Sequence, residues 1–126
     1  ARVIVEAYRN AGVPVHEIRA CGGIAGKNPL MMQIYADVLG RALRVADTTE
    51  AGARGSAVYA AASAGLYPSI TEAAERLSCD CSAVYYPDPA RHAAYDALYR
   101  EYVTLHAYFG EGENNVMARL RAIAAN

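Results

Sequence analysis

The sequence predicts an α/β fold followed by a helical tail. In the first half of the chain, segments with helical spacing of apolar residues alternate with short strand-like segments. In the second half, a capping signal and a long stretch with an apolar stripe predict helices only. Alternating helices and strands are typical of proteins in which helices cover a sheet.

Composition narrows the class of protein. The chain has 126 residues, of which 54% are hydrophobic, enough for one packed core. Its 12 basic and 13 acidic residues nearly cancel, so no charge excess favours nucleic acid or an anionic membrane surface. No apolar run approaches the roughly 20 residues of a membrane helix, and no signal-peptide layout is present. We therefore expect a cytoplasmic protein that binds neither nucleic acid nor membrane.

Apolar spacing and helix-end signals define the first half. The predicted elements are a helix over residues 2–11, a strand over 16–21, a helix over 29–39, a strand over 42–46 and a helix over 53–64. Gly12 and Pro14 end the first helix, because glycine suits the position after a helix and proline cannot continue one. Asn28 is the predicted N-cap of the second helix, with Pro29 at its first position and Gly40 at its end.

Helices alone are predicted in the second half. The predicted elements are a helix over residues 69–77, a loop over 78–87, a helix over 88–109 and a helix over 115–124. Ser69 and Glu72 have the spacing of a capping box. Asp88 and Pro89 begin the long helix, and Gly110 stops it. The apolar stripe of that helix consists of Leu98, Tyr102, Leu105 and Phe109.

The stretch from Cys21 to Pro29, C-G-G-I-A-G-K-N-P, is the strongest candidate for a binding site. Gly22 and Gly23 follow a predicted strand, and their missing Cβ atoms let a ligand approach the backbone. A strand, a glycine turn and a helix start form a common nucleotide-binding arrangement. Taken alone, a tight turn explains the two glycines as well. Asn28 either caps the helix or contacts a nucleotide.

The residues around this stretch resemble a known family. Residues 20–40, A-C-G-G-I-A-G-K-N-P-L-M-M-Q-I-Y-A-D-V-L-G, are similar to the adenosine-binding segment of the FGGY family of carbohydrate kinases. The counterparts of the family pattern are Gly22, Gly23, Asn28, Gln33, Ala36, Asp37 and Gly40. Residues 50–57, E-A-G-A-R-G-S-A, look like the helix start that follows in the family. The tail from Tyr86 through His92, Tyr95 and Tyr99 is similar to the end of the family's L-ribulose kinases.

The resemblance implies a fold and a division of the chain. The fold is expected to be the C-terminal portion of an actin-like (ribonuclease H-like) ATPase domain followed by a helical tail. Residues 1–68 would form the adenosine-side part of the second kinase lobe, and residues 69–126 a helical extension of the same lobe. Because the chain begins at Ala1 inside a helical pattern, we expect a fragment of a longer protein.

The resemblance also implies an activity for the whole protein. ATP would transfer its γ-phosphate to the 5-hydroxyl of L-ribulose, with Mg²⁺ bridging the phosphates. The implied nucleotide-binding residues are Gly22, Gly23, Lys27 and Asn28. No catalytic residue and no metal ligand is implied within this chain, so the chain alone is expected to phosphorylate nothing. The catalytic base, the phosphate-binding loops and the sugar contacts would lie outside it.

Two other functions stay open at the level of sequence. The first is another pentulose or polyol kinase, because the nucleotide segment is shared within the family. The second is a non-catalytic oligomerisation or docking module, which the tyrosine-rich helix from Tyr95 to Phe109 favours. A homodimer is a related expectation.

The remaining polar candidates have structural explanations. Gln33 and Asp37 lie four apart on one predicted helix face, which indicates a solvated face or a hydrogen bond within the fold. Cys21 is expected to be a small buried residue. Cys79 and Cys81 lack the further ligands of a zinc site. His92 is expected to be a surface or structural residue.

Overall fold

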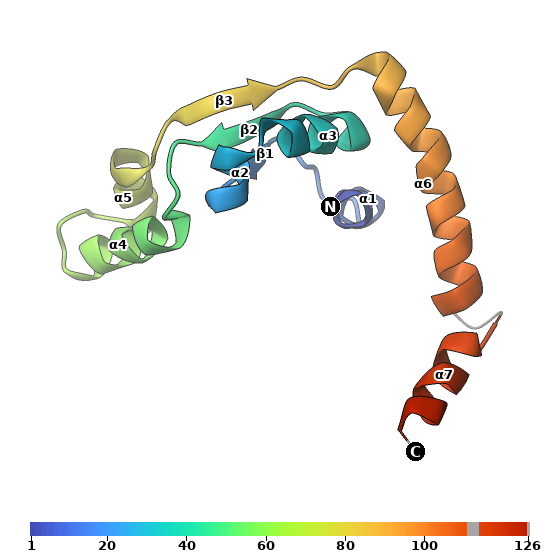
Figure 1. Cartoon of the computed structure of the whole chain (residues 1–126). Coiled ribbons are helices and arrows are strands. Elements are labelled where there is room, and N and C mark those ends of the chain that lie inside the picture. Colours follow the sequence, from blue (N-terminus) through green and yellow to red (C-terminus); the bar gives the residue numbers. More distant parts are fainter. Residues whose placement is uncertain (111–113, 126) are drawn as a thin grey trace.

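One mixed sheet organises the part of the chain that the computed structural model describes, residues 1–110 and 114–125. β1 (Ile18–Ala20) runs parallel to β2 (Leu43–Ala46), and β3 (Cys81–Tyr85) runs antiparallel to β2 on its other side. The strand order is therefore β1-β2-β3 (Figure 1). The two parallel strands confirm the prediction that the first half has α/β character.

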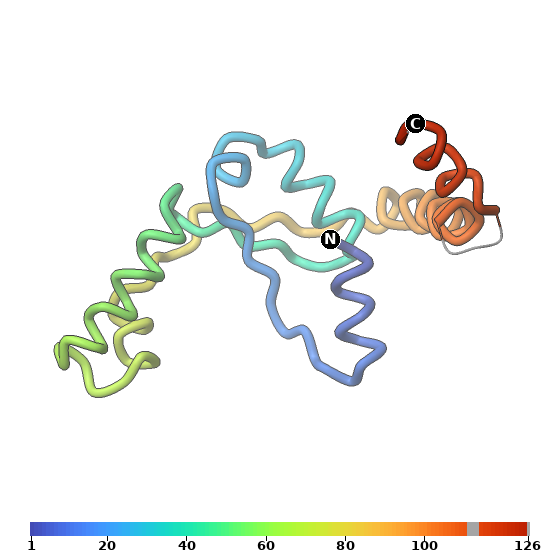
Figure 2. The backbone as a smooth tube through the Cα atoms, turned by 90° about the horizontal axis from the view of Figure 1, so that it is seen from below, coloured from blue at the N-terminus to red at the C-terminus, as the bar shows by residue number. Residues whose placement is uncertain are grey.

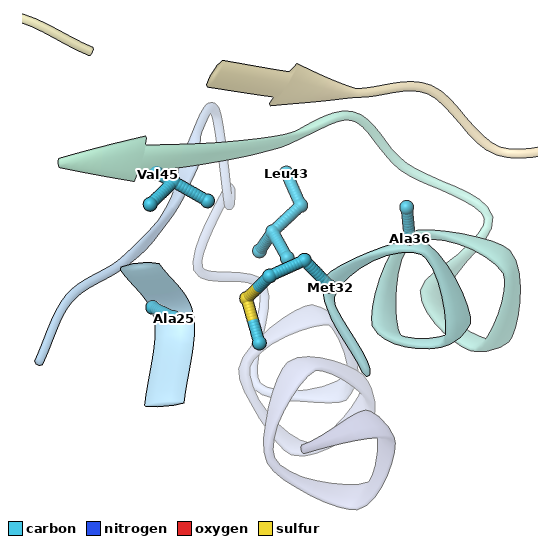
Figure 3. Packing of buried hydrophobic residues seen from close by; sticks show 5 residues of the cluster. All are labelled: Ala25, Met32, Ala36, Leu43 and Val45. Carbon is cyan, nitrogen blue, oxygen red and sulfur yellow. The ribbon is translucent and has the colours of Figure 1, made fainter. Parts of the chain in front are cut away.

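The core lies on one face of this sheet. Leu43 and Val45 are two residues apart on β2, so both point to the same face, while Arg44 between them is exposed. The helix that precedes β2 contributes Met32 and Ala36, which pack with these side chains (Figure 3). Ala25 completes the buried cluster. The core thus holds the segment between β1 and β2 against the sheet.

Three helices precede β2; the second and third contribute residues to that core, and the first packs on the third. They are α1 (Arg2–Asn10), α2 (Gly23–Lys27) and α3 (Pro29–Leu39). The predicted helices over 2–11 and 29–39 are confirmed. The short helix α2 was not predicted, because its sequence G-I-A-G-K has too few apolar positions to define a period. Cys21, expected to be buried, is exposed between β1 and α2.

Glycines end two of these helices as predicted. Gly12 has a φ of +74°, and the amide after it, from Val13, donates to the carbonyl of Tyr8 over 2.9 Å. This is the hydrogen bond of a Schellman end. Gly40 has a φ of +61° and caps α3 in the left-handed conformation.

α4 (Ala51–Ser63) and α5 (Ile70–Leu77) form a helical hairpin between β2 and β3. They pack mainly on each other, and Val58 and Ala73 are buried. Ser69 caps α5 by accepting a hydrogen bond of 3.1 Å from the amide of Glu72, so this half of the predicted capping box is confirmed.

The loop predicted over residues 78–87 is wrong in its middle, where the chain forms β3. Leu43 faces Tyr85 and Val45 faces Ala83 across the antiparallel pair. The stretch is too short to reveal a strand by its own pattern. It becomes one because β2 offers an unpaired edge, whose N–H and C=O groups need partners. The second half therefore contributes to the sheet, and the division of the chain at residue 68 stays a prediction.

α6 (Pro89–Gly110) and α7 (Val116–Ala124) complete the chain. Both views show α6 leaving one end of the sheet and the α4–α5 hairpin extending from the other (Figures 1 and 2). The predicted stripe of α6 is exposed at Leu98, Tyr102, Leu105 and Phe109. Among the described helices, none combines the length and hydrophobicity that a membrane span requires.

Candidate functional site

Gly22 and Gly23 lie at the connection between the end of β1 and the start of α2. Gly22 has a φ of +90° and a ψ of 175°, a backbone conformation that a residue with a Cβ adopts only under strain. Gly23 has no such requirement, and a Cβ built there would meet nothing within 4 Å. The turn explains the glycine at Gly22 but not the one at Gly23. Open space at Gly23 is what a ligand lying against the backbone needs.

The four predicted nucleotide-binding residues share one short segment beyond the carboxyl end of β1. Gly23, Lys27 and Asn28 are exposed, and Gly22 is partly exposed. Ala25, in the middle of the segment, is buried and anchors it to the core. Ligands of open α/β sheets bind beyond the carboxyl ends of the strands. The structure therefore brings the candidates together on an accessible surface that is held in place from below.

Asn28 has the capping role that its position predicts. Its Oδ1 accepts a hydrogen bond of 2.9 Å from the amide of Met31, and Pro29 follows at the first helical position. This bond satisfies one of the unpaired amides at the start of α3. Asn28 is exposed as well, so the cap and a nucleotide contact are compatible.

Two substitutions test the capping role of Asn28. Asn28→Ala is expected to lower the free energy of unfolding by about 1 kcal/mol, because the cap is lost. Asn28→Asp should leave stability nearly unchanged, since a carboxylate caps equally well. Urea unfolding of the three proteins is the measurement. Equal stability of Asn28→Ala and the unsubstituted protein would contradict the capping role.

A small hollow lies where β2 ends and α4 begins. Its volume is about 200 Å³, below the roughly 300–1,000 Å³ of ligand pockets, so it does not enclose a nucleotide by itself. Arg54 and Gly55, which belong to the segment similar to the family's helix start, are part of its lining. The guanidinium of Arg54 donates a hydrogen bond of 3.1 Å to the carbonyl of Leu77, and Arg54 is exposed.

Asp37, on α3, is a charged residue buried within the described part of the chain, with 1% of its surface exposed. Its Oδ1 accepts hydrogen bonds of 2.9 Å from Gln33 Nε2 and 2.8 Å from the amide of Asp88. Its Oδ2 accepts a bond of 2.7 Å from Arg91 Nε. Of the two alternatives predicted for this pair, a hydrogen bond within the fold is confirmed. The alternative, a solvated face, is wrong for Asp37, because the start of α6 covers it.

The surroundings of Asp37 keep it ionised. Burial by itself raises the pKa of this carboxyl, but the amide of Asp88, the guanidinium of Arg91 and the amide of Gln33 outweigh that effect. The pKa of Asp37 is therefore held below its usual value. A buried carboxylate with hydrogen bonds on both oxygens is a structural anchor.

His92 extends the contact between α3 and α6. Its Nδ1 lies 2.7 Å from the carbonyl oxygen of Asp37, so this nitrogen carries the proton that is donated to the carbonyl. The ring lies against Gly40, where a Cβ would come within 2.6 Å of it. Gln33 also donates to the carbonyl of Tyr86 over 2.8 Å. The expectation that His92 is structural is confirmed.

A second polar cluster joins α1 to α6. Arg2 pairs with Glu6 through Nε at 2.9 Å and with Asp96 at 2.6 Å, and its guanidinium carbon lies 4.1 Å from the centre of the Tyr99 ring. The hydroxyl of Tyr99 donates to Glu6 over 2.8 Å. The hydrogen bond from Arg2 lowers the pKa of both Glu6 and Asp96. Two clusters, which meet where His92 Nε2 lies 3.7 Å from Asp96 Oδ2, therefore fix the first half of α6.

Sequence reasoning missed the contacts that join α6 to α3 and to α1. The Asp88-Pro89 pair predicted where α6 begins but not what it packs against. No spacing rule connects Asp37 to Arg91, because they are 54 residues apart and meet only after β3 has paired. Within the described residues, no group of three or more potential metal-ligating side chains comes together.

Comparison with known proteins defines the class to which this arrangement belongs. The model of the FGGY family of carbohydrate kinases, C-terminal domain, matches residues 1–64, half of the chain. The chain therefore belongs to the FGGY family of carbohydrate kinases. The matched residues include β1, the glycine pair, α3 and β2.

Particular relatives within that family are ribulokinases. The chain is 47% identical to the ribulokinase of Halalkalibacterium halodurans, over 97% of this chain and 22% of that protein. It is 45% identical to the ribulokinase of Geobacillus thermodenitrificans, over 95% of this chain and 22% of that protein. The chain thus spans about a fifth of the length of these relatives.

A solved structure agrees on the fold. A ligand-bound xylulose kinase from Lactobacillus acidophilus superposes with a TM-score of 0.69 at 21% identity, over 87% of this chain and 22% of that one. The predicted fold class, the C-terminal portion of an actin-like ATPase domain, is confirmed.

Proposed function

We propose that this chain supplies the adenosine side of the active site in an ATP-dependent L-ribulose kinase. The observation that carries the proposal is the exposed Gly22–Gly23 backbone beyond β1, at a position where the turn itself does not require Gly23. Similarity to ribulokinases along almost the whole chain supports L-ribulose as the substrate. The whole protein would transfer the γ-phosphate of ATP to the 5-hydroxyl of L-ribulose in the cytoplasm.

The residues of this chain fit the nucleotide end of that reaction. Adenine or ribose would lie against the backbone of Gly22 and Gly23, which offers a flat surface without side chains. Lys27 and Asn28 follow within the same exposed segment and would contact the nucleotide at its edge. Orientation of the nucleotide is the contribution required here, because phosphoryl transfer depends largely on positioning and electrostatics.

The other parts of the reaction are assigned to the rest of the protein. Mg²⁺ would neutralise charge on the phosphates and would be held through their oxygens. The general base and the sugar contacts would come from segments outside this chain. We therefore propose that residues 1–126 alone are inactive, and turnover by the isolated chain would contradict this.

A sugar panel tests the proposed function. A full-length kinase whose matching segment is this chain is assayed with ATP and L-ribulose, D-xylulose or glycerol. The highest kcat/KM is expected for L-ribulose. A preference for another pentulose or polyol would support the kinase activity but reject L-ribulose as its substrate. Absence of any ATP-dependent phosphorylation would reject the kinase in favour of a docking module.

Gly23→Val is expected to weaken nucleotide binding specifically. A Cβ at this position meets no atom within 4 Å, so the fold should tolerate the side chain, but valine would occupy the space assigned to adenosine. We expect KM for ATP to rise about tenfold, equivalent to about 1.4 kcal/mol. KM for L-ribulose and the melting temperature serve as internal controls and should stay unchanged. An unaltered KM for ATP would place the nucleotide elsewhere.

The exposed stripe of α6 favours the docking function as a second candidate. Leu98 and Leu105 are 64% and 56% exposed on this helix. Light scattering of the isolated chain and of the full-length kinase over a range of concentrations would separate the explanations. Dimerisation of both proteins would support a homodimer through this helix. Association of the isolated chain alone would indicate that the rest of the kinase normally covers the stripe.

A further inference from the structure

The start of α6 is tied to α3 more tightly than packing alone requires. Four hydrogen bonds connect the two regions: Asp88 and Arg91 to the carboxylate of Asp37, His92 to its carbonyl oxygen, and Gln33 to the carbonyl of Tyr86. α3 is also the helix that begins at the nucleotide segment. We propose that Asp37 is a positioning residue for nucleotide binding, which aligns the Gly22–Asn28 segment by locking α3 onto α6. This inference rests on the proposed kinase function.

The path from Asp37 to the nucleotide segment is short and rigid. α3 has 11 residues and a left-handed glycine cap at its end, and Asn28 caps its start. The cap at Asn28, the core contacts of Met32 and Ala36 and the bonds of Asp37 hold α3 along its length, and Arg2 adds a bond of 3.4 Å to the carbonyl of Val38. Without the bonds of the Asp37 carboxylate, fewer contacts oppose a small rotation of α3 about its core contacts. Asn28 at the start of α3 would then move with it and shift the end of the nucleotide segment, because a helix transmits such a rotation along its length.

The bonds from Asp88 and Arg91 to Asp37 can be removed without unfolding the rest of α6. Arg2, Glu6, Asp96 and Tyr99 hold the next turns of α6 on α1, and none of them contacts Asp37 in the described structure. The side chain of Arg91 is 56% exposed, so its replacement leaves no cavity. Variants at Asp37 and Arg91 should therefore change the alignment of α3 while the fold is retained.

The test uses a full-length kinase whose matching segment is this chain. Asp37→Asn keeps the shape of the side chain but replaces one accepting oxygen with an amide that donates. Arg91→Gln removes the guanidinium and leaves the other bonds of Asp37 in place. Glu101→Gln, an exposed residue on the same helix, is the matched control for loss of a charge.

We expect Asp37→Asn and Arg91→Gln to raise KM for ATP about fivefold, or about 1 kcal/mol, with kcat and KM for L-ribulose within twofold. Arg91→Lys should raise KM for ATP less than Arg91→Gln does, because lysine restores the charge but not the planar donor geometry. Glu101→Gln should equal the unsubstituted enzyme in every parameter.

Hydrogen exchange gives a readout that a purely structural role would not move. If the nucleotide and the lock are coupled, ADP must protect the amides of residues 88–92, because coupling between two sites is reciprocal. The amide of Asp88 is the direct reporter, since it donates to Asp37. The protection should be present in the unsubstituted enzyme and absent in Arg91→Gln.

The outcomes are distinct. An unchanged KM for ATP in a folded Arg91→Gln enzyme, with ADP protection retained, would overturn the inference. A fall in kcat together with a rise in both KM values would also overturn it, because such a pattern indicates general destabilisation. If Asp37→Asn does not fold, Arg91→Gln alone decides. Failure of the unsubstituted enzyme to use ATP would instead reject the proposed function.

Discussion

Gly40→Ala is expected to lower the free energy of unfolding by about 2–5 kcal/mol. Two effects add: a left-handed conformation costs a residue with a Cβ about 1–2 kcal/mol, and overpacking costs about 1–3 kcal/mol. Both apply here, because Gly40 has a φ of +61° and its added Cβ would lie 2.6 Å from the ring of His92. To make room, His92 must shift and lengthen its contact with the carbonyl of Asp37. Urea unfolding followed by circular dichroism measures the effect.

Gly12 provides the matched control for Gly40. Its φ is +74°, but a Cβ there would meet nothing within 4 Å. Gly12→Ala should therefore show only the backbone effect, about 1–2 kcal/mol. His92→Ala combined with Gly40→Ala should destabilise by less than the sum of the single changes, since the clash requires both side chains. Equal effects at Gly12 and Gly40 would show that the contact with His92 contributes nothing.

Asp37→Ala is expected to lower the free energy of unfolding by about 2–4 kcal/mol at neutral pH. The change removes an acceptor of three hydrogen bonds and leaves the amide of Asp88 covered and without its partner. Arg91 can turn its guanidinium to solvent, which keeps the effect below that of breaking a fully buried ion pair. Urea unfolding at pH 7 measures it, with Glu101→Ala as the exposed control.

The effect of Asp37→Ala should depend on pH in one direction. The folded protein holds the pKa of Asp37 below its ordinary value of 3.8, so the charged form stabilises the fold. This contribution is complete above pH 3.8 and is lost as the pH falls through the lower pKa of the folded protein. The two proteins should therefore differ most at neutral pH and converge in strong acid. A constant difference across this range would contradict the role of the charge.

The sequence by itself determined the local elements and the family. Helix ends were predictable because their signals are local: Asn28 and Ser69 accept bonds from amides three residues away, and Gly40 adopts the conformation that glycine favours. The candidate nucleotide segment was predictable for the same reason, since Gly22 through Asn28 are contiguous. Resemblance supplied the family, which the comparison with the C-terminal domain model confirmed.

Only the tertiary structure decided which strands pair and which distant side chains come into contact. The strand β3 forms because β2 has an open edge, a fact that residues 78–87 do not contain. The burial of Asp37 depends on Asp88 and Arg91, which reach it only after β3 has carried the chain back along the sheet. Long-range pairing of this kind leaves no periodic trace in the sequence. A carboxylate on an otherwise unremarkable helix face thereby becomes the anchor between α3 and α6.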